Sequence, residues 1–174
     1  MAETDARLRY PRYAVRARGL THVSVHADDL EESTRFYEEL FGMERLPTAK
    51  FRHRVQWLRL GDQQLHLFAD EVEAPLYHHF GFDVDDFEAV YCKAKELGVL
   101  DFETWTSPIR EHPSGWVQMY IRDPAGNLVE VDWADASTLD RSLITELARL
   151  DDEIPQTGEA RTATLYHALE PTRR

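Results

Sequence analysis

Two stretches of the chain alternate between polar and apolar residues, which is the pattern of a β-strand that has one face against a core. The first covers residues 20–26, where valines lie on one face and His22 lies on the other. The second covers residues 77–84 and repeats the same order of polar and apolar positions around His79. The two stretches therefore predict one kind of strand that occurs twice, with a histidine in each copy.

Each predicted strand leads into a helical pattern that ends at a glycine. In the first copy Asp28 or Asp29 can accept hydrogen bonds from the first free amides of a helix, and Gly42 suits the left-handed conformation that ends one. In the second copy the helical pattern covers residues 86–97 and stops at Gly98. A repeat of this length predicts two copies of one structural unit.

Three further strands are predicted after each helix, because short apolar runs alternate there with turn residues such as Gly61 and Asp62. They are expected at residues 43–48, 51–60 and 63–69 in the first copy and near residues 99–105, 115–122 and 127–133 in the second. Each copy then has the order βαβββ. The predicted fold class is therefore α+β, built from two βαβββ modules.

The predicted layout of the chain has five parts. An arm without a regular pattern comes first, then the first module, an acidic linker, the second module and a C-terminal part: residues 1–17, 18–70, 71–76, 77–133 and 134–174. The C-terminal part is expected to begin with an amphipathic helix capped by Ser137 or Thr138, because leucines recur there at helical spacing. A polar tail follows this helix.

The composition limits the classes of function. With 174 residues and 43% hydrophobic positions, the chain is long enough for one compact domain or two small modules that share a core. A formal net charge of −12 argues against binding to nucleic acid or to an anionic membrane surface. The sequence has no apolar run long enough to span a membrane and no apolar secretory signal near Met1. Its one cysteine, Cys92, cannot form an internal disulfide, so a cytoplasmic location is expected.

Each module carries one residue that can bind a metal on its first strand and another on its last strand. In the first module these are His22 and His66, and in the second they are His79 and Glu130. Each lies among apolar neighbours, so its side chain points to the opposite face of its sheet. Two curved sheets related by a pseudo-two-fold axis would bring the four side chains together. A single strand histidine usually faces solvent, but four residues at equivalent positions of a repeat favour a site for one divalent metal ion: Ni, Zn, Co, Mn or Fe.

Several motifs together resemble the vicinal oxygen chelate superfamily, which includes glyoxalase I, extradiol dioxygenases, bleomycin and fosfomycin resistance proteins and methylmalonyl-CoA epimerase. The motifs are Gly19 to His22, Phe36-Tyr37 followed by Leu40 to Gly42, His79 followed by Asp85-Asp86, and Tyr120 to Asn127 followed by Glu130. This resemblance covers residues 18–133. It implies that the modules pair into a curved, barrel-like mixed sheet around a central cleft. It also implies a homodimer, a small-molecule substrate, and metal ligands at His22, His66, His79 and Glu130.

The resemblance implies a chemistry as well, because members of the superfamily use a metal to bind two neighbouring substrate oxygens and to stabilise an oxyanion or an enolate. The activity that we expect is that of a glyoxalase I-like lyase or isomerase. Glu130 is the one carboxylate among the four expected ligands, so it would serve as ligand, base or both. His112 and Tyr120 are the other candidate catalytic residues.

An Fe(II) extradiol dioxygenase is the first alternative. His22, His79 and Glu130 alone would form the two-histidine, one-carboxylate set that is typical of non-haem Fe(II) oxygenases. His112 followed by Tyr120 also resembles the signature of the enzymes that cleave catechols. The same residues therefore allow two different reactions.

Two features weaken this alternative. Gln64 occupies the position where the catalytic histidine of the extradiol enzymes would align. A fourth ligand at His66 would leave two open positions on an octahedral ion, whereas a chelating catechol and O₂ need three. The remaining alternative belongs to a different class: a protein that sequesters a small molecule in the cleft without turnover, as bleomycin resistance proteins do.

Overall fold

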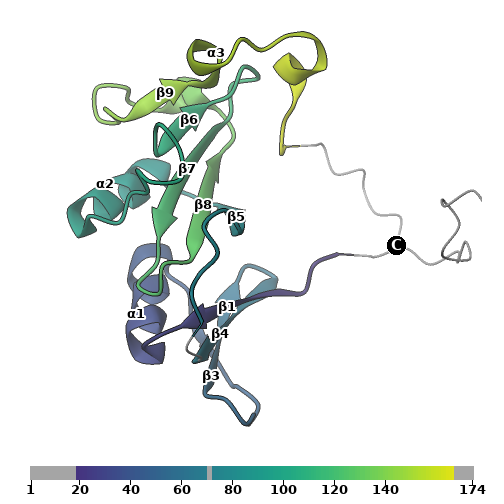
Figure 1. The fold of residues 1–174 in the computed structure, drawn as a ribbon, viewed down its shortest axis with the longest axis vertical. Helices are drawn as coiled ribbons and strands as arrows, with labels where there is room; N and C mark the ends of the chain where they lie inside the picture. The colour runs from purple at the N-terminus through teal and green to yellow at the C-terminus, as the bar shows by residue number, and fades with distance from the viewer. Residues whose placement is uncertain (1–18, 70–71, 167–174) are drawn as a thin grey trace, which may run out of the picture.

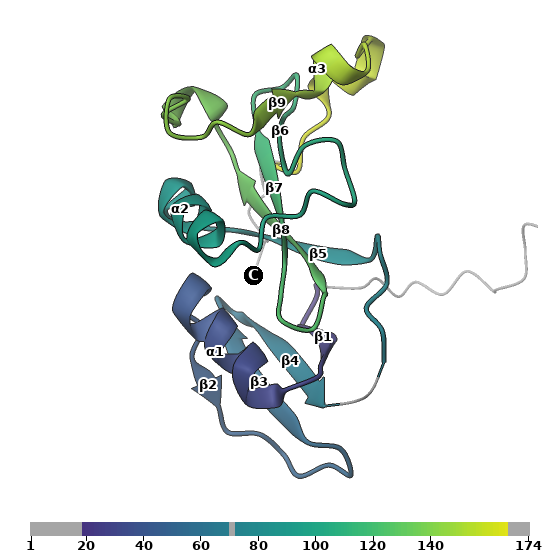
Figure 2. The same ribbon diagram turned by 60° about the vertical axis from the view of Figure 1, so that its left-hand side comes forward.

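The computed structural model describes residues 19–69 and 72–166 (Figures 1 and 2), so the arm expected at residues 1–17 lies outside the described part. The first module contains β1 (His22–Ala27), α1 (Leu30–Phe41), β2 (Arg45–Leu46), β3 (Val55–Leu60) and β4 (Gln63–Ala69). The second contains β5 (His79–Asp83), α2 (Phe87–Leu97), β6 (Ile109–Glu111), β7 (Val117–Arg122) and β8 (Leu128–Trp133). Residues 134–166, the C-terminal extension, contain β9 (Leu147–Arg149), α3 (Leu150–Glu153) and 3₁₀ turns at Ala136–Thr138 and Gly158–Thr162.

The strands form two sheets of the same design. Sheet A has the order β1-β4-β3-β2, and sheet B has the order β5-β8-β7-β6-β9. In each sheet the first strand of the module pairs in parallel with its last strand, β1 with β4 and β5 with β8. This confirms the α+β fold of two βαβββ modules. In the described part of one chain the two sheets are separate and do not close into a barrel. Both long helices, α1 and α2, lie on the same side of the sheets (Figures 1 and 2).

Both long helices begin and end where the sequence predicts. The side chain of Asp29 accepts hydrogen bonds from two amides in the first turn of α1, each at 2.9 Å, and Asp86 accepts one at the start of α2. Gly42 and Gly98 end the helices with φ angles of 62° and 68°. Residues with a Cβ rarely adopt this left-handed conformation, which explains the two glycines.

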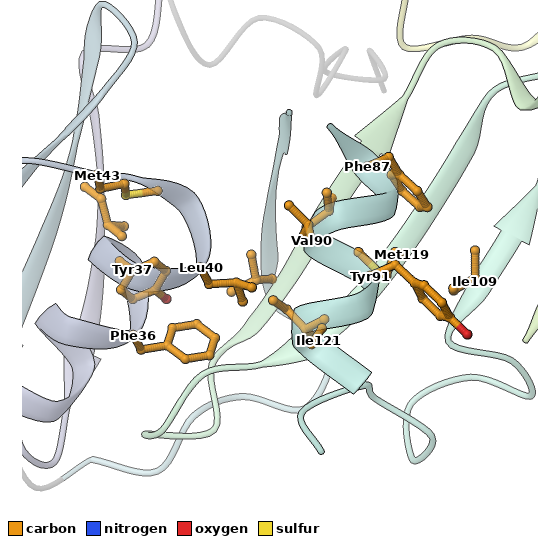
Figure 3. Close-up of a cluster of buried hydrophobic side chains, with 14 of the residues drawn as sticks. Phe36, Tyr37, Leu40, Met43, Phe87, Val90, Tyr91, Ile109, Met119 and Ile121 are labelled. Atoms are coloured by element: carbon orange, nitrogen blue, oxygen red, sulfur yellow. The ribbon is translucent and has the colours of Figure 1, made fainter. Parts of the chain in front are cut away.

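The faces of α1 and α2 pack into one hydrophobic core that joins the modules (Figure 3). Tyr37 of α1 and Tyr91 of α2 are almost completely buried in it. Phe41 of α1 meets Phe82 of β5 edge to face, with ring centroids 4.8 Å apart. Aromatic pairs of this geometry contribute about 0.5–1.5 kcal/mol beyond the burial of their surface. The apolar contacts therefore hold the modules side by side.

A buried polar cluster fixes how the modules are oriented. The hydroxyl of Tyr37 donates to Oδ2 of Asp123 at 2.8 Å, which bonds α1 to the turn between β7 and β8. Nδ2 of Asn127 donates to the same oxygen and to the carbonyl oxygen of His26, each at 2.8 Å. Burial raises the pKa of the Asp123 carboxyl and of the Tyr37 phenol. We term Tyr37, Asp123 and Asn127 the inter-module lock.

The strand predicted near residues 99–105 does not form, so that prediction was wrong. Leu100 makes one isolated bridge to β7. Beyond it the chain turns, because Asp101 accepts the amide of Thr104 and forms an ion pair with Arg122 at 3.0 Å. The second strand of the second module forms later in the chain, as β6.

The C-terminal helix predicted from the leucine pattern is also replaced by other structure. Residues 136–138 form a single 3₁₀ turn, and Leu147 lies in β9, where it pairs with Ile109 of β6. Asp140 turns the chain between them by accepting hydrogen bonds from the amide and hydroxyl of Ser142. The pairing of β9 with the open edge strand β6 therefore takes precedence over the helix that the leucine spacing predicts. The one α-helix in this region, α3, is 4 residues long. In the described residues no helix has the length and apolar composition needed to cross a membrane.

Replacing Asp123 by alanine is expected to destabilise the fold by about 2–4 kcal/mol, because the buried groups of Tyr37 and Asn127 lose their acceptor. Urea unfolding followed by circular dichroism measures the change. Asp85→Ala is the matched control, since Asp85 is exposed and its loss should cost less than about 0.5 kcal/mol. Equal stability of the two variants would contradict the role of the inter-module lock.

Candidate metal centre

The two expected ligands of the first module lie in a stack of three rings on sheet A. His22 of β1 and His66 of β4 stack with ring centroids 4.4 Å apart and an angle of 14° between the rings. Trp57 of β3 stacks on His66 at 4.7 Å. Because β4 lies between β1 and β3, His66 is the middle ring, and it is only 8% exposed. His22 is the outer ring and is exposed.

The ring nitrogens of this stack are not equally free to bind a metal. Nε2 of His66 lies 2.9 Å from Oε1 of Gln64, and because an amide oxygen only accepts, we assign the ring proton of His66 to Nε2. Burial, with a smaller effect of His22, lowers the pKa of His66. The lone pair of an imidazole lies in the plane of its ring, so two parallel stacked rings do not direct their lone pairs at one ion. His22 is therefore the better placed ligand of the pair.

The two expected ligands of the second module face each other on sheet B. Nε2 of His79 lies 3.2 Å from Oε2 of Glu130. Nδ1 of His79 lies 2.8 Å from the carbonyl oxygen of Tyr77, and since a carbonyl only accepts, this nitrogen carries the ring proton. In the neutral ring the lone pair of Nε2 faces the carboxylate, so a metal cation can take the place that a second ring proton would occupy in an ion pair with Glu130. A histidine oriented through its second nitrogen in this way is typical of metal ligands, so the pair fits a metal site.

The candidate catalytic residues Tyr120 and His112 lie on the same face of sheet B as Glu130. Tyr120 is the cross-strand partner of Glu130, and burial followed by the hydrogen bond to Glu130 raises the pKa of its phenol. His112 bonds through Nε2 to Oε1 of Gln118 at 2.6 Å and stacks on Trp116 with centroids 3.7 Å apart. Burial lowers the pKa of His112. Both side chains are thus held in their neutral forms on this face.

The structure brings the four expected ligands together as two pairs and not as one group of four. In residues 19–69 and 72–166, no three histidine, cysteine, aspartate or glutamate side chains gather closely enough to hold a metal ion. The His22–His66 pair belongs to sheet A and the His79–Glu130 pair to sheet B, and the two sheets are separate within the chain. Each pair is therefore half of the site expected from the sequence.

Residues 19–131 match the family model described as the glyoxalase/bleomycin resistance protein/dioxygenase superfamily. The chain belongs to this superfamily. Membership confirms the resemblance found in the sequence, and the matched residues include both pairs. One fold can carry different chemistries, so membership does not decide the reaction.

Two curated proteins are similar to this chain in sequence. The chain is 28% identical over 123 residues to an uncharacterized protein of Pseudomonas aeruginosa, a match that covers 66% of this chain and 87% of that protein. It is 38% identical over 80 residues to a probable trivalent organoarsenical cleaving enzyme of Bacillus subtilis, a match that covers 44% of this chain and 52% of that enzyme. The second match therefore spans about half of the length of the relative.

Solved structures of the superfamily are similar in fold. A lactoylglutathione lyase from Agrobacterium tumefaciens has a TM-score of 0.53 at 26% identity, over 67% of this chain and 94% of that chain. The fosfomycin resistance protein FosX from Listeria monocytogenes has a TM-score of 0.56 at 18% identity, over 67% of this chain and 92% of that chain. At 18% identity the likeness shows the fold alone. Both proteins are matched over most of their lengths, whereas about a third of this chain extends beyond the match.

A further carboxylate, Asp132, lies on the face of sheet B that carries Glu130, and it was not among the residues predicted from the sequence. It follows Glu130 by two positions on β8, so both side chains point to the same side of sheet B. Asp132 is 5% exposed, and its Oδ1 has no hydrogen-bond partner in the described residues. Burial and the charge of Glu130 raise the pKa of Asp132 to about 8. Gly81 makes room for it, since a Cβ there would lie 2.9 Å from Oδ2 of Asp132. The alternation along β8 is the signal that would have found this residue.

Asp132→Asn is expected to stabilise the metal-free protein increasingly as the pH rises from about 4 to about 8, with little further change above that. A carboxyl whose pKa is raised on folding stabilises the folded state while it is protonated, and this contribution is lost as the pH rises through about 8. Asparagine carries no charge, so the gain at the upper end is roughly 1–3 kcal/mol. Urea unfolding in EDTA at several pH values measures it, with the exposed Asp85→Asn as control. A gain that does not depend on pH would contradict the raised pKa.

Proposed function

We propose that the protein is a metal-dependent enzyme that acts on a small substrate with two neighbouring oxygens. Its reaction is the transfer of a proton next to a carbonyl, as in glyoxalase I-like lyases and isomerases. The contact of 3.2 Å between His79 and Glu130 carries the proposal, because the carbonyl of Tyr77 orients Nε2 of His79 toward the carboxylate. The similarity to a lactoylglutathione lyase supports the reaction class. The single cysteine, Cys92, supports a cytoplasmic location.

The proposed ligands are His22, His79 and Glu130, with His66 as the fourth expected position. Imidazole and carboxylate groups suit one divalent first-row ion, such as Ni, Zn, Co, Mn or Fe. Such an ion, when bound, supplies Lewis acidity that polarises the substrate oxygens. His22 bonds to Thr21 through Nδ1, so its Nε2 is the nitrogen left for a ligand role.

The side chains of sheet B would move the proton. Glu130 is the carboxylate of the ligand set and is 5% exposed, so it is the group that takes a proton from carbon and returns it. Tyr120 keeps its hydroxyl protonated because its pKa is raised, and this hydroxyl is a donor beside Glu130. His112 is neutral and is oriented by Gln118, so it can exchange a proton with the substrate or with water.

We infer that a complete site needs two chains. Each chain holds the His22–His66 pair and the His79–Glu130 pair on separate sheets, and the inter-module lock fixes how these sheets are oriented. A dimer with two-fold symmetry can place sheet A of one chain against sheet B of its partner, and the symmetry repeats this contact. A homodimer would then contain two identical sites, each with ligands from both chains.

One observation favours the extradiol dioxygenase as a second candidate. Nε2 of His66 is bonded to Gln64, and its ring stacks on His22, so His66 is not aimed as a ligand. A metal held by His22, His79 and Glu130 alone would keep the three open positions that a chelating catechol and O₂ need. Partial similarity to a probable organoarsenical cleaving enzyme is compatible with a reaction other than proton transfer.

Elemental analysis of the purified, reconstituted protein and of its Glu130→Gln variant tests the metal site. We expect about one divalent ion per chain in the unaltered protein and less than about a tenth of that in the variant, because the variant lacks the only carboxylate of the ligand set. Glu103→Gln is the matched control, since Glu103 is exposed. Full occupancy in Glu130→Gln would contradict the assignment.

The same analysis of His66→Ala separates the two reactions. Loss of the metal together with His66 supports a four-ligand site, and the unaltered protein should then exchange the α-hydrogens of hydroxyacetone with D₂O, as NMR would show. Iron that is retained without His66 supports the three-ligand site, and O₂ uptake with catechol is then expected. A fully loaded protein that performs neither reaction would indicate a protein that sequesters its ligand.

A further inference from the structure

The end of the C-terminal extension, residues 163–166, lies on the face of sheet B that carries Glu130. Figures 1 and 2 show α2 on one side of sheet B and the end of the extension, drawn in yellow, on the other. The family match ends at residue 131, so the extension is an addition to the shared fold. Its last described residues, 163–166, contact this face at two places.

The first contact is next to a candidate catalytic histidine. The carbonyl oxygen of Ala163 accepts hydrogen bonds from Oγ of Ser114 at 2.5 Å and from Nε1 of Trp116 at 3.1 Å. Trp116 in turn stacks on His112. The start of the segment is therefore fixed at the end of the face where β7 begins.

The second contact is two strands away, at the end of β5. The hydroxyl of Tyr166 donates a short hydrogen bond to Oδ1 of Asp83. Asp83 is the cross-strand partner of Asp132, which shares its face with Glu130. Burial and the bond to Asp83 raise the pKa of Tyr166, with smaller effects of Asp132 and Glu130, so its hydroxyl stays protonated. Tyr166 is thus within electrostatic range of the expected metal ligand.

These contacts are not needed to attach the extension to the fold. β9 already pairs in parallel with β6. Glu146 forms an ion pair with Lys95 of α2 at 2.8 Å, and Glu153 forms one with Arg110 of β6 at 3.0 Å. The segment from residue 163 to residue 166 therefore adds contacts at the candidate site to an extension that is anchored elsewhere.

We propose that residues 163–166 form a wall of the substrate site and that Tyr166 is a specificity-determining residue that limits the site to compact substrates. The inference rests on the proposed function. A substrate held at Glu130 that extends along β8 toward Asp132 meets Tyr166 at the Asp132–Asp83 pair, about 7 Å away, the length of two strand residues. The hydroxyl of Tyr166 also gives the wall a donor that can bond to a substrate oxygen in place of Asp83.

Ligand binding to the cobalt(II)-loaded protein tests the wall, because the visible spectrum of the ion reports binding without turnover. The probes are catechol and the larger 2,3-dihydroxynaphthalene, which both chelate through two neighbouring oxygens. In Tyr166→Ala the ratio of their two Kd values is expected to change by about tenfold in favour of the larger probe, since a pocket wall discriminates by size to about this extent. Binding of catechol itself should change little.

Two further variants control for a general loosening of the fold. Thr162 lies beside the wall, and within residues 19–69 and 72–166 its hydroxyl bonds only to the carbonyl oxygen of Glu159. In Thr162→Ala the ratio should therefore stay as in the unaltered protein. Tyr166→Trp enlarges the side chain and should shift the ratio toward catechol. If both Tyr166 variants bind cobalt and the ratio of the two Kd values is unchanged, the proposed role of Tyr166 is wrong, whereas the proposed metal site is not affected. If the unaltered protein took up no cobalt, the proposed function would be overturned, and this inference with it.

Discussion

The carboxylate of Asp123 joins parts of the chain that are far apart in the sequence, and the orientation of the two sheets depends on it. It accepts hydrogen bonds from Tyr37 of the first module and from Asn127, which itself bonds to the backbone of His26 in β1. Apolar contacts between α1 and α2 alone would tolerate several orientations, because they have little directional preference. Buried hydrogen bonds are directional and costly to leave unmade, so they select one orientation. That orientation decides where the two pairs of expected metal ligands lie.

Each module supports a rigid pair of side chains, and neither pair is a metal site by itself. On sheet A the stack places His22 outermost, and on sheet B the carbonyl of Tyr77 turns His79 toward Glu130. If two chains complete the site, metal binding and chain association become linked equilibria, because the ion binds only where both halves are present. In the site that we propose, the two modules provide half-sites of fixed geometry. The C-terminal extension with Tyr166 adds a contact that lies outside the family match.

Local patterns predicted the parts of this structure that local physics determines. Alternating residues around His22 and His79 gave the strands, and the aspartate and glycine signals gave both helix ends. The strand near residues 99–105 failed because Arg122, distant in the sequence, holds Asp101 in a turn. The C-terminal helix failed because Leu147 meets the open edge of β6. Likewise, the contact of Tyr166 with Asp83 and the bond of His66 to Gln64 depend on the folded chain, and spacing along the sequence does not encode them.

The most direct test of the shared site is the metal content of a mixed dimer, in which one chain carries His22→Ala and the other carries Glu130→Ala. Two different affinity tags allow the mixed species to be purified from co-expressed chains. If the ligands come from two chains, one of the two sites of the mixed dimer keeps His22, His79 and Glu130 intact and the other loses both altered residues. We then expect about one ion per mixed dimer, and almost none in either variant alone. A mixed dimer without metal, beside an unaltered protein that binds it, would contradict the account.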